Sequence, residues 1–319
     1  MLALGLDTSC YTTSAALCSE DGLLKQERRL LPVPRGERGL RQSEAVFAHV
    51  RQLPQVLLPL LSEAKGKIGC VCASDRPRDG EDSYMPVFQV GVSQGRALAA
   101  ALDVPFFTTT HQRGHIAAAK YGTGLEADRF VALHLSGGTT DALLMDGDSL
   151  IPLGTSADLH AGQLVDRIGV KLGLPFPAGP SLEELAVRGE NRNRVPVSFE
   201  GDGLNCHLSG AEAQLLRMIE TGECRENVAA EVYGVLCRTV LRLVQAAAEK
   251  SGVRDALIAG GVASSRLLRD LLAERNEKRR TGLKLSFGRP ELSGDNAVGV
   301  SLIGLENMRR TEDGIQESI

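Results

Sequence analysis

The order of apolar and polar stretches along the chain occurs twice. Residues 2–30, LALGLDTSCYTTSAALCSEDGLLKQERRL, hold three short apolar runs separated by a Thr/Ser turn and an acidic Gly turn, which predicts three strands. Residues 130–156, FVALHLSGGTTDALLMDGDSLIPLGTS, show the same arrangement with Gly-rich turns. Agreement in both element order and turn chemistry favours an internal duplication over two unrelated α/β halves that look alike.

The segments that follow each strand triplet also correspond. The first copy continues with a helix near 43–64, expected to kink at Pro54 and Pro59, and the second with a long amphipathic helix near 226–250. Each copy then has a continuous apolar run, a further helical stretch and a last strand, 104–110 or 283–288. Continuous apolar strands that alternate with helices are typical of buried, partly parallel sheets, so we expect an α/β fold of two related lobes.

The length of 319 residues also exceeds what one compact core usually holds. We expect an N-terminal lobe at 1–125 and a C-terminal lobe at 126–319. The segment 175–223 has no counterpart in the first copy and is rich in Pro, Gly and charge. It is therefore predicted to be an insertion in the second lobe.

Two histidines have a spacing that suits a shared metal. His111 and His115 are four residues apart at a predicted helix start, which places both imidazoles on one helix face. Asp295 holds the corresponding place after the last strand of the second copy, so we expect it to reach the same metal from the opposite lobe. Two alternatives to a metal site stay open. The two histidines could be incidental polar residues at a helix start, and Asp295 could cap the N-terminus of its helix. Gln112 replaces the Glu that a HExxH protease uses as its base, which disfavours a protease.

Several Gly-rich turns could hold an anion. The turn Leu135–Asp141 joins two predicted strands and offers backbone N–H groups and hydroxyls, and the run Asp7–Cys10 is its counterpart in the first copy. Gly260 and Gly261 end a strand before a helix, where a nucleotide can approach the backbone. Asp166 lies in a helix that leads to the Pro/Gly loop 177–180 and could accept a ribose hydroxyl. The alternative interpretations are ordinary tight turns for the Gly-rich segments and a solvated helix residue for Asp166.

Composition narrows the partners and the compartment. The net charge is −4, and the only short basic run is Lys278–Arg280, so unaided binding of nucleic acid is not expected. The 7 cysteines show no CxxC pair, which predicts free thiols in a reducing cytoplasm. Neither a signal peptide nor an apolar stretch long enough to span a bilayer is apparent, so no membrane association is expected.

These motifs together resemble the metal-dependent threonylcarbamoyl transferases of tRNA modification, formerly labelled glycoproteases or O-sialoglycoprotein endopeptidases. The matching pieces cover nearly the whole chain: LGLDTSC, HQRGH, LSGGTTD, VDRIGVKLGLPFPAGP, LSG, AGGVASSRLLR and GDNA. The resemblance implies a duplicated actin-like ATPase fold with a nucleotide and metal cleft between its lobes. It also implies transfer of threonylcarbamoyl from its adenylate to a tRNA adenine, with partner proteins.

The resemblance carries over to individual residues. It implies that His111, His115 and Asp295 bind one divalent ion, iron or zinc. It also matches Leu135, Ser136, Gly137, Gly138, Thr139, Asp166 and Gly179 to positions that bind the adenylate. Together with Gly260, Gly261 and Ser265, these are the residues expected to bind an acyl-adenylate or an ATP-like nucleotide.

The sequence also departs from the family pattern. The family's acidic SCDET run is Ser9–Thr13 here, without carboxylates, and its AGPGL loop is Ser74–Gly80. Single changes stand where the family has His, Lys, Asn and Glu: Thr139, Glu212, Ser265 and Gln163. The sequence is therefore compatible with two functions. One is an active transferase, and the other is a non-catalytic paralogue that binds nucleotide and metal and regulates or scaffolds an active relative, a homologous lobed partner.

Overall fold

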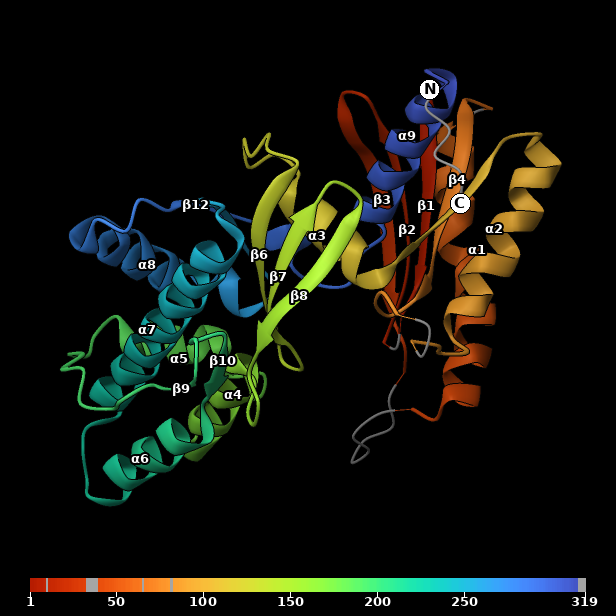
Figure 1. Cartoon of the computed structure of the whole chain (residues 1–319). Coiled ribbons are helices and arrows are strands. Elements are labelled where there is room, and N and C mark those ends of the chain that lie inside the picture. Colours follow the sequence, from red (N-terminus) through yellow and green to blue (C-terminus); the bar gives the residue numbers. More distant parts are fainter. Residues whose placement is uncertain (10, 33–39, 65, 81–82, 315–319) are drawn as a thin grey trace. The chain divides into compact units, whose positions relative to one another are not determined.

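The chain folds into two compact units (Figure 1). The computed structural model describes residues 1–9, 11–32, 40–64, 66–80 and 83–314. Unit 1 comprises Met1–Tyr121 together with Gly294–Ile319, and unit 2 comprises Gly122–Ser293.

Unit 1 is built on a five-stranded sheet in the order β3-β2-β1-β4-β5. Its strands are β1 (Leu2–Thr8), β2 (Thr12–Ser19), β3 (Gly22–Leu30), β4 (Ile68–Arg76) and β5 (Phe106–Thr110). The first three strands form an antiparallel meander, and β4 and β5 run parallel to β1. Helices α1 (Gln42–Ala64) and α2 (Phe88–Leu102) cover one face of this sheet, while α9 (Val298–Glu312) packs on the other, with α3 (His111–Lys120) beside it (Figure 1).

The alternation of β1 explains how its residues divide between the two faces. Leu2, Leu4 and Leu6 join the apolar core that α1 and α2 cover. Successive side chains of a strand point to opposite faces, so Ala3, Gly5 and Asp7 face α9 and α3. The single carboxylate of an otherwise apolar strand is thereby placed on the face of the sheet that carries the two histidines.

Unit 2 repeats the strand order of unit 1. Its sheet has the order β12-β11-β6-β7-β8, again with three antiparallel strands followed by two parallel ones. The strands are β6 (Arg129–Leu135), β7 (Thr140–Asp146), β8 (Ser149–Thr155), β11 (Asp255–Ala259) and β12 (Lys284–Phe287). Shared topology in the two units confirms the duplication predicted from the hydrophobic pattern.

Helices and one small hairpin complete unit 2. They are α4 (Ala161–Lys171), α5 (Gly179–Ala186), α6 (Ser209–Glu220), α7 (Arg225–Ser251), α8 (Arg266–Arg279), the 3₁₀ turns η1 (Val262–Ser264) and η2 (Pro290–Leu292), and the hairpin β9 (Ser198–Glu200) and β10 (Asn205–His207). The long helix α7 is buried along most of its length and forms the centre of the apolar core. The segment 175–223, without counterpart in unit 1, contains α5, β9, β10 and α6.

One expectation about the domains needs correction. The last helix was expected in the second lobe, but α9 belongs to unit 1. Small residues allow the close packing that holds it there: a Cβ added to Gly5 would lie 2.5 Å from the Ala297 carbonyl oxygen, and one added to Gly299 would lie 1.8 Å from the carbonyl oxygen of Gly114. Within this contact the buried Ser301 hydroxyl donates to the Ala3 carbonyl at 2.8 Å.

The proline positions, the cysteines and the hydropathy of the helices test further expectations. Helix α1 continues through Pro54 and Pro59 as one element. The six described cysteines are all free thiols, and Cys10 lies outside the described residues. Among the described helices, none has the length and apolar character required to cross a membrane.

Candidate functional site

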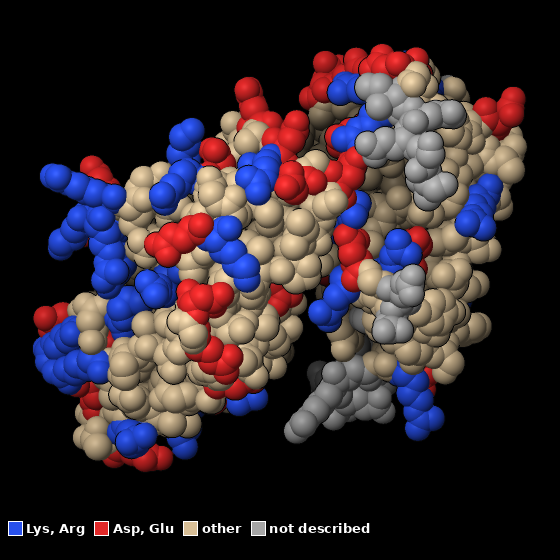
Figure 2. Space-filling model, viewed as in Figure 1, with Lys and Arg blue, Asp and Glu red and all other residues tan. Residues whose placement is uncertain are grey.

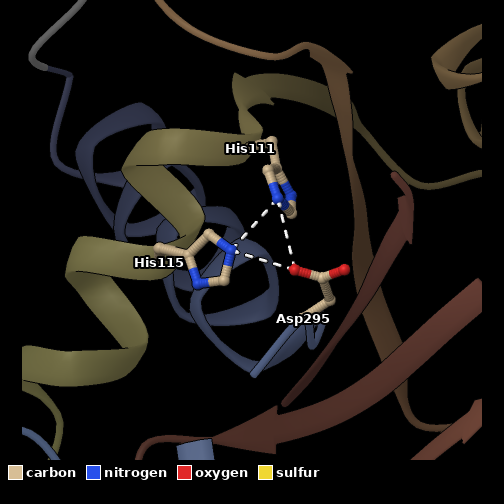
Figure 3. A group of neighbouring side chains, drawn as sticks. All are labelled: His111, His115 and Asp295. Atoms are coloured by element: carbon tan, nitrogen blue, oxygen red, sulfur yellow. Dashed lines mark hydrogen bonds and ion pairs between the residues drawn. The ribbon is translucent and has the colours of Figure 1, made fainter. Parts of the chain in front are cut away.

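The two predicted metal-binding histidines lie together at the start of α3 (Figure 3). Thr110, the last residue of β5, caps the helix by accepting a hydrogen bond from the Arg113 backbone N–H at 3.2 Å. The i, i+4 spacing then brings the Nε2 atoms of His111 and His115 to 3.0 Å from one another. Both rings therefore present the same nitrogen to one point.

Asp295 completes the group from the segment that precedes α9. Its Oδ1 atom lies 3.3 Å from His115 Nε2 and 3.6 Å from His111 Nε2. The three potential ligand atoms all fall within 4.8 Å of one another. The sequence placed Asp295 in the opposite lobe, whereas all three residues belong to unit 1. The group thus depends on the packing of α9 against α3 within one unit.

A buried carboxylate holds the first histidine. Asp7 is fully buried at the end of β1, and its two oxygens lie 3.0 and 3.1 Å from His111 Nδ1. The Ser74 hydroxyl of β4 donates to the same carboxylate. An Nδ1–H bond to a carboxylate fixes the ring with Nε2 toward His115 and Asp295, and this is how metal-binding histidines are commonly oriented. Burial alone would lower the pKa of His111, but the charges of Asp7 and Asp295 outweigh it and raise the pKa to about 9.

Hydroxyl groups from the turn after β1 orient the second carboxylate. Ser9 and Thr12 donate to Asp295 Oδ2 at 3.3 and 3.2 Å, so Oδ1 is the oxygen that faces the histidines. Burial would raise the pKa of Asp295, but the hydrogen bond from His115, the charges of the two histidines and the Thr12 bond hold it far below its usual range. The carboxylate is therefore ionised, as a metal ligand must be.

A third histidine supports this turn from the other side of the sheet. His49 of α1 is fully buried, and its Nε2 donates to the Ser9 carbonyl at 2.8 Å while Nδ1 lies 2.8 Å from the Thr13 hydroxyl. Burial lowers the pKa of His49, against weaker opposing contributions from the Ser9 bond and the Asp7 charge. Sequence reasoning missed the roles of Asp7 and His49. Their signal was present, because an ionisable residue within an apolar strand or on an apolar helix face is rarely buried without a partner.

The donor set fits a divalent metal. Two imidazole nitrogens and one carboxylate oxygen converge, and His111 and Asp295 each have hydrogen-bonded support behind them. Two His and one carboxylate match both non-haem iron and catalytic zinc sites, which keep coordination positions open.

Unit 2 gathers the predicted nucleotide-binding residues in two groups. In the first, the turn between β6 and β7 carries Gly137 and Gly138, which are exposed and have no heavy atom near an added Cβ. The Gly138 N–H donates to the Ser136 hydroxyl at 3.3 Å. Gly162, at the start of α4, packs directly on this turn and donates its N–H to the Ser136 carbonyl at 3.1 Å. Gly260 has φ +98° and approaches the Leu135 carbonyl so closely that any side chain would clash.

The second group is centred on Tyr233 of α7. Its hydroxyl donates to the Gly179 carbonyl at 3.3 Å and lies beside the Ser265 side chain. Asp166 lies beside this group, because its Oδ1 accepts the Ala178 N–H at 2.8 Å. One of its oxygens is thus occupied by the protein, and the other is the one available for a ribose hydroxyl. Helix α4 carries both Gly162 and Asp166 and so links the two groups.

Comparison with known proteins agrees with these features. A profile described as tRNA N6-adenosine threonylcarbamoyltransferase matches residues 38–301. A protein of that name from Thermus thermophilus is 31% identical over 100% of this chain and 95% of its own length. Another from Methanopyrus kandleri is 29% identical over 96% of this chain and 87% of its own length. A relative from Methanothermobacter thermautotrophicus, named a probable bifunctional tRNA threonylcarbamoyladenosine biosynthesis protein, is 27% identical over 95% of this chain but only 55% of its own length.

Solved structures show the same fold at low sequence identity. HypF from T. kodakarensis matches with a TM-score of 0.65 and 16% identity, covering 98% of this chain and 48% of that one. Component A of the Acidaminococcus fermentans (R)-2-hydroxyglutaryl-CoA dehydratase matches with a TM-score of 0.57 and 15% identity, covering 97% and 99%. These neighbours confirm the actin-like ATPase fold. From the profile and the full-length relatives, this chain belongs to the tRNA N6-adenosine threonylcarbamoyltransferase family.

Proposed function

We propose that this protein transfers a threonylcarbamoyl group from its adenylate to the adenine amine of a tRNA, with a divalent metal bound by His111, His115 and Asp295. The observation that carries the proposal is the convergence of these three ligand atoms within 4.8 Å in a member of this transferase family. The carboxylate and hydroxyl groups behind the ligands support a built site rather than a chance cluster.

The metal would act as a Lewis acid that polarises and orients a carbonyl or phosphoryl oxygen. The protein's own residues prepare its site. Asp7 fixes the orientation of His111, and the Ser9 and Thr12 hydroxyls fix the direction of the Asp295 carboxylate. His49 in turn holds the Ser9 backbone. Iron and zinc both suit this donor set.

The nucleotide part of the donor is assigned to unit 2. The exposed turn at Gly137 and Gly138 suits phosphate oxygens, because successive N–H groups in a Gly-rich turn form an anion-binding concavity. The Gly138 N–H donates to the Ser136 hydroxyl at 3.3 Å, so a phosphate would replace or share this bond. The second oxygen of Asp166 suits a ribose hydroxyl. Partner proteins are also proposed, supported by relatives named bifunctional, of whose length this chain covers little more than half.

A second function has one specific observation in its favour. The family's acidic run after β1 is absent, and Thr12, which stands at one of its two acidic positions, donates its hydroxyl to Asp295 instead of offering a carboxylate. A paralogue that binds metal and nucleotide and supports an active relative would have no need of those carboxylates. The intact ligand group favours the transferase, since a scaffold has little use for two imidazoles and a carboxylate that converge.

One experiment distinguishes the active transferase from the non-catalytic paralogue. The full chain, with candidate partner proteins, is incubated with labelled threonylcarbamoyl-adenylate and unmodified tRNA, and label in the tRNA is counted. Metal content is measured for the wild type, His111→Ala and Asp295→Ala. His207→Gln serves as the matched control, because His207 also pairs with carboxylates, Glu200 and Asp158, but lies in unit 2.

The expected result is label transfer by the wild type, with metal and transfer lost in both ligand variants and kept in the control. Absence of transfer while the adenylate still binds would support the non-catalytic paralogue. Equal metal content in all four proteins would refute the metal site.

A further inference from the structure

A groove on unit 2 brings together four arginines that are dispersed in the sequence. Helix α7 contributes Arg238 and Arg242, one turn apart on the same face, and α8 contributes Arg275 and Arg279, also one turn apart. The groove has a volume of about 200 Å³, and its apolar lining comes from Val197, Phe199 and Leu241. Figure 2 shows Lys and Arg side chains gathered over α7 and α8 on the viewed face of this unit.

The charged residues that line the groove are all arginines. Among the ion pairs of the described residues, none involves any of the four arginines. Glu231 is the carboxylate that acts most on Arg238, but it is buried and accepts backbone N–H groups of Arg192 and Arg194. The arginines of α7 and α8 therefore repel one another, and burial together with the neighbouring Arg275 lowers the pKa of Arg238.

Neutral groups hold one of these arginines in place. The Arg238 guanidinium donates to the Asn193 side-chain oxygen and to the Val195 carbonyl, both in the segment that leads to β9. Arg242 lies against Gly203, where an added Cβ would be 3.1 Å from its Nε. The floor of the groove is thus ordered without its charge being neutralised, which is the condition for binding an external anion.

We propose that this groove binds the phosphodiester backbone of RNA, and that it is a docking surface for the tRNA acceptor of the proposed reaction. Guanidinium groups form paired hydrogen bonds with phosphate oxygens and keep their charge at any physiological pH. The apolar side chains between them suit the flat faces of bases or ribose, which an acidic peptide does not offer. This inference rests on the proposed function only for the choice of tRNA as the RNA.

The groove also explains why the sequence predicted no RNA-binding surface. The overall charge is −4 and the basic residues form no long run. The packing of α7 against α8 brings together two pairs of arginines that are separated in the chain by the whole β11 strand and the turn that follows it.

The test measures binding of unmodified tRNA to the full chain, by fluorescence anisotropy over a range of salt concentrations, without adenylate. The double variant Arg242→Gln/Arg275→Gln removes two groove charges and leaves Arg238, which has structural contacts, in place. Arg217→Gln is the matched control, since Arg217 is an exposed arginine of α6 in the same unit and bonds only to a backbone carbonyl. Circular dichroism checks that all variants fold.

The double variant should bind tRNA more weakly, and the slope of log affinity against log salt should fall by roughly 1.4–1.8, because each phosphate contact contributes about 0.7–0.9. The control should retain both affinity and slope. No binding by the wild type at low salt, or equal slopes in all three proteins, would overturn the proposal. Polyglutamate that binds as tightly as tRNA, with the same loss in the double variant, would instead identify the groove as a docking surface for acidic protein.

Failure of this inference and failure of the proposed function are distinguishable. His111→Ala should abolish transfer but leave tRNA binding unchanged. Transfer by the double variant with an unaltered KM for tRNA would refute the groove and leave the transferase proposal intact.

Discussion

Replacing Gly5 by Ala tests whether the contact between β1 and α9 holds both the fold of unit 1 and the metal ligands. The added Cβ would lie 2.5 Å from both the Ala297 carbonyl oxygen and the Ser301 backbone nitrogen, and 2.8 Å from the Ser301 Cα. All three atoms belong to the backbone, so no side-chain rotation relieves the overlap. Ordinary contact requires α9 to move by about 1 Å from the sheet.

The cost can be estimated from the groups that this movement disturbs. Overpacking a close-packed core by one methyl group costs about 1–3 kcal/mol. The Ser301 hydroxyl also bonds to the Ala3 carbonyl and to the Cys18 N–H, and stretching either buried bond adds about 0.5–1.5 kcal/mol. A combined loss of about 1.5–4.5 kcal/mol lowers the melting temperature of a unit of this size by about 3–18 °C.

The same variant should also weaken metal binding, because Asp295 lies three residues before α9 and moves with it. Thermal unfolding followed by circular dichroism gives the first quantity, and competition with a chromophoric chelator gives the second. Gly210→Ala is the control, because Gly210 lies in α6 with no heavy atom within 4 Å of an added Cβ. Alanine favours a helix more than glycine does, so the melting temperature of this variant should be unchanged or slightly raised. A Gly5→Ala protein with wild-type melting temperature and metal affinity would refute this account of how α9 is held.

Three further predictions concern single groups. Asp7→Asn removes the charge behind His111 and should weaken metal binding about 10- to 100-fold in the same chelator competition; an unchanged affinity would show that Asp7 does not support the site. Cys224 is the one exposed thiol among the described cysteines, and burial raises the pKa of Cys18, Cys206 and Cys237 to about 11 and of Cys70 to about 12. Alkylation at pH 8 followed by peptide mapping should therefore label Cys224 well before these four, and prompt labelling of the four would contradict their burial. Asp158 has its pKa lowered, because hydrogen bonds from Ser209, Leu208 and Leu159 outweigh the opposing effect of burial. A carboxyl group whose pKa is lower in the folded than in the unfolded state stabilises the fold at pH values above its unfolded pKa, and this contribution is lost as the pH falls through its folded pKa. Asp158→Asn should therefore lower the free energy of unfolding in urea at pH 7 and have less effect near pH 3. An equal effect at both pH values would exclude an electrostatic origin.

The predicted metal ligands show how far local sequence information reaches. His111 and His115 lie four residues apart, and helix geometry alone places their rings on one face, as the structure has them. The turn that contains Gly137 and Gly138 could also be predicted from the sequence, because two apolar runs of strand length flank it. Both features depend on contacts between residues that are close in the chain, and such contacts can be predicted from the spacing of apolar and polar side chains.

The position of Asp295 was predicted for the wrong reason. Its correspondence to the start of α3 suggested that it would stay with the second lobe, but α9 lies against β1 and α3 in unit 1. The decisive contacts involve Gly5, Gly114 and Gly299, each of which allows two backbones to approach closely. A glycine in a sequence shows that close approach is possible and does not show which segment will approach.

The sequence by itself determined the duplicated order of strands and helices, the histidine pair and the Gly-rich turns, because these follow from periodicity and spacing along the chain. Only the tertiary structure decided that Asp7 supports His111, that Ser9 and Thr12 orient Asp295, and that four arginines of α7 and α8 form one groove. Asp7 and His111 are 104 positions apart, and Ser9 and Asp295 are 286 apart. Such pairs are selected by the packing of whole elements against one another, and the hydrophobic pattern of each element specifies that it has a buried face without specifying its neighbour.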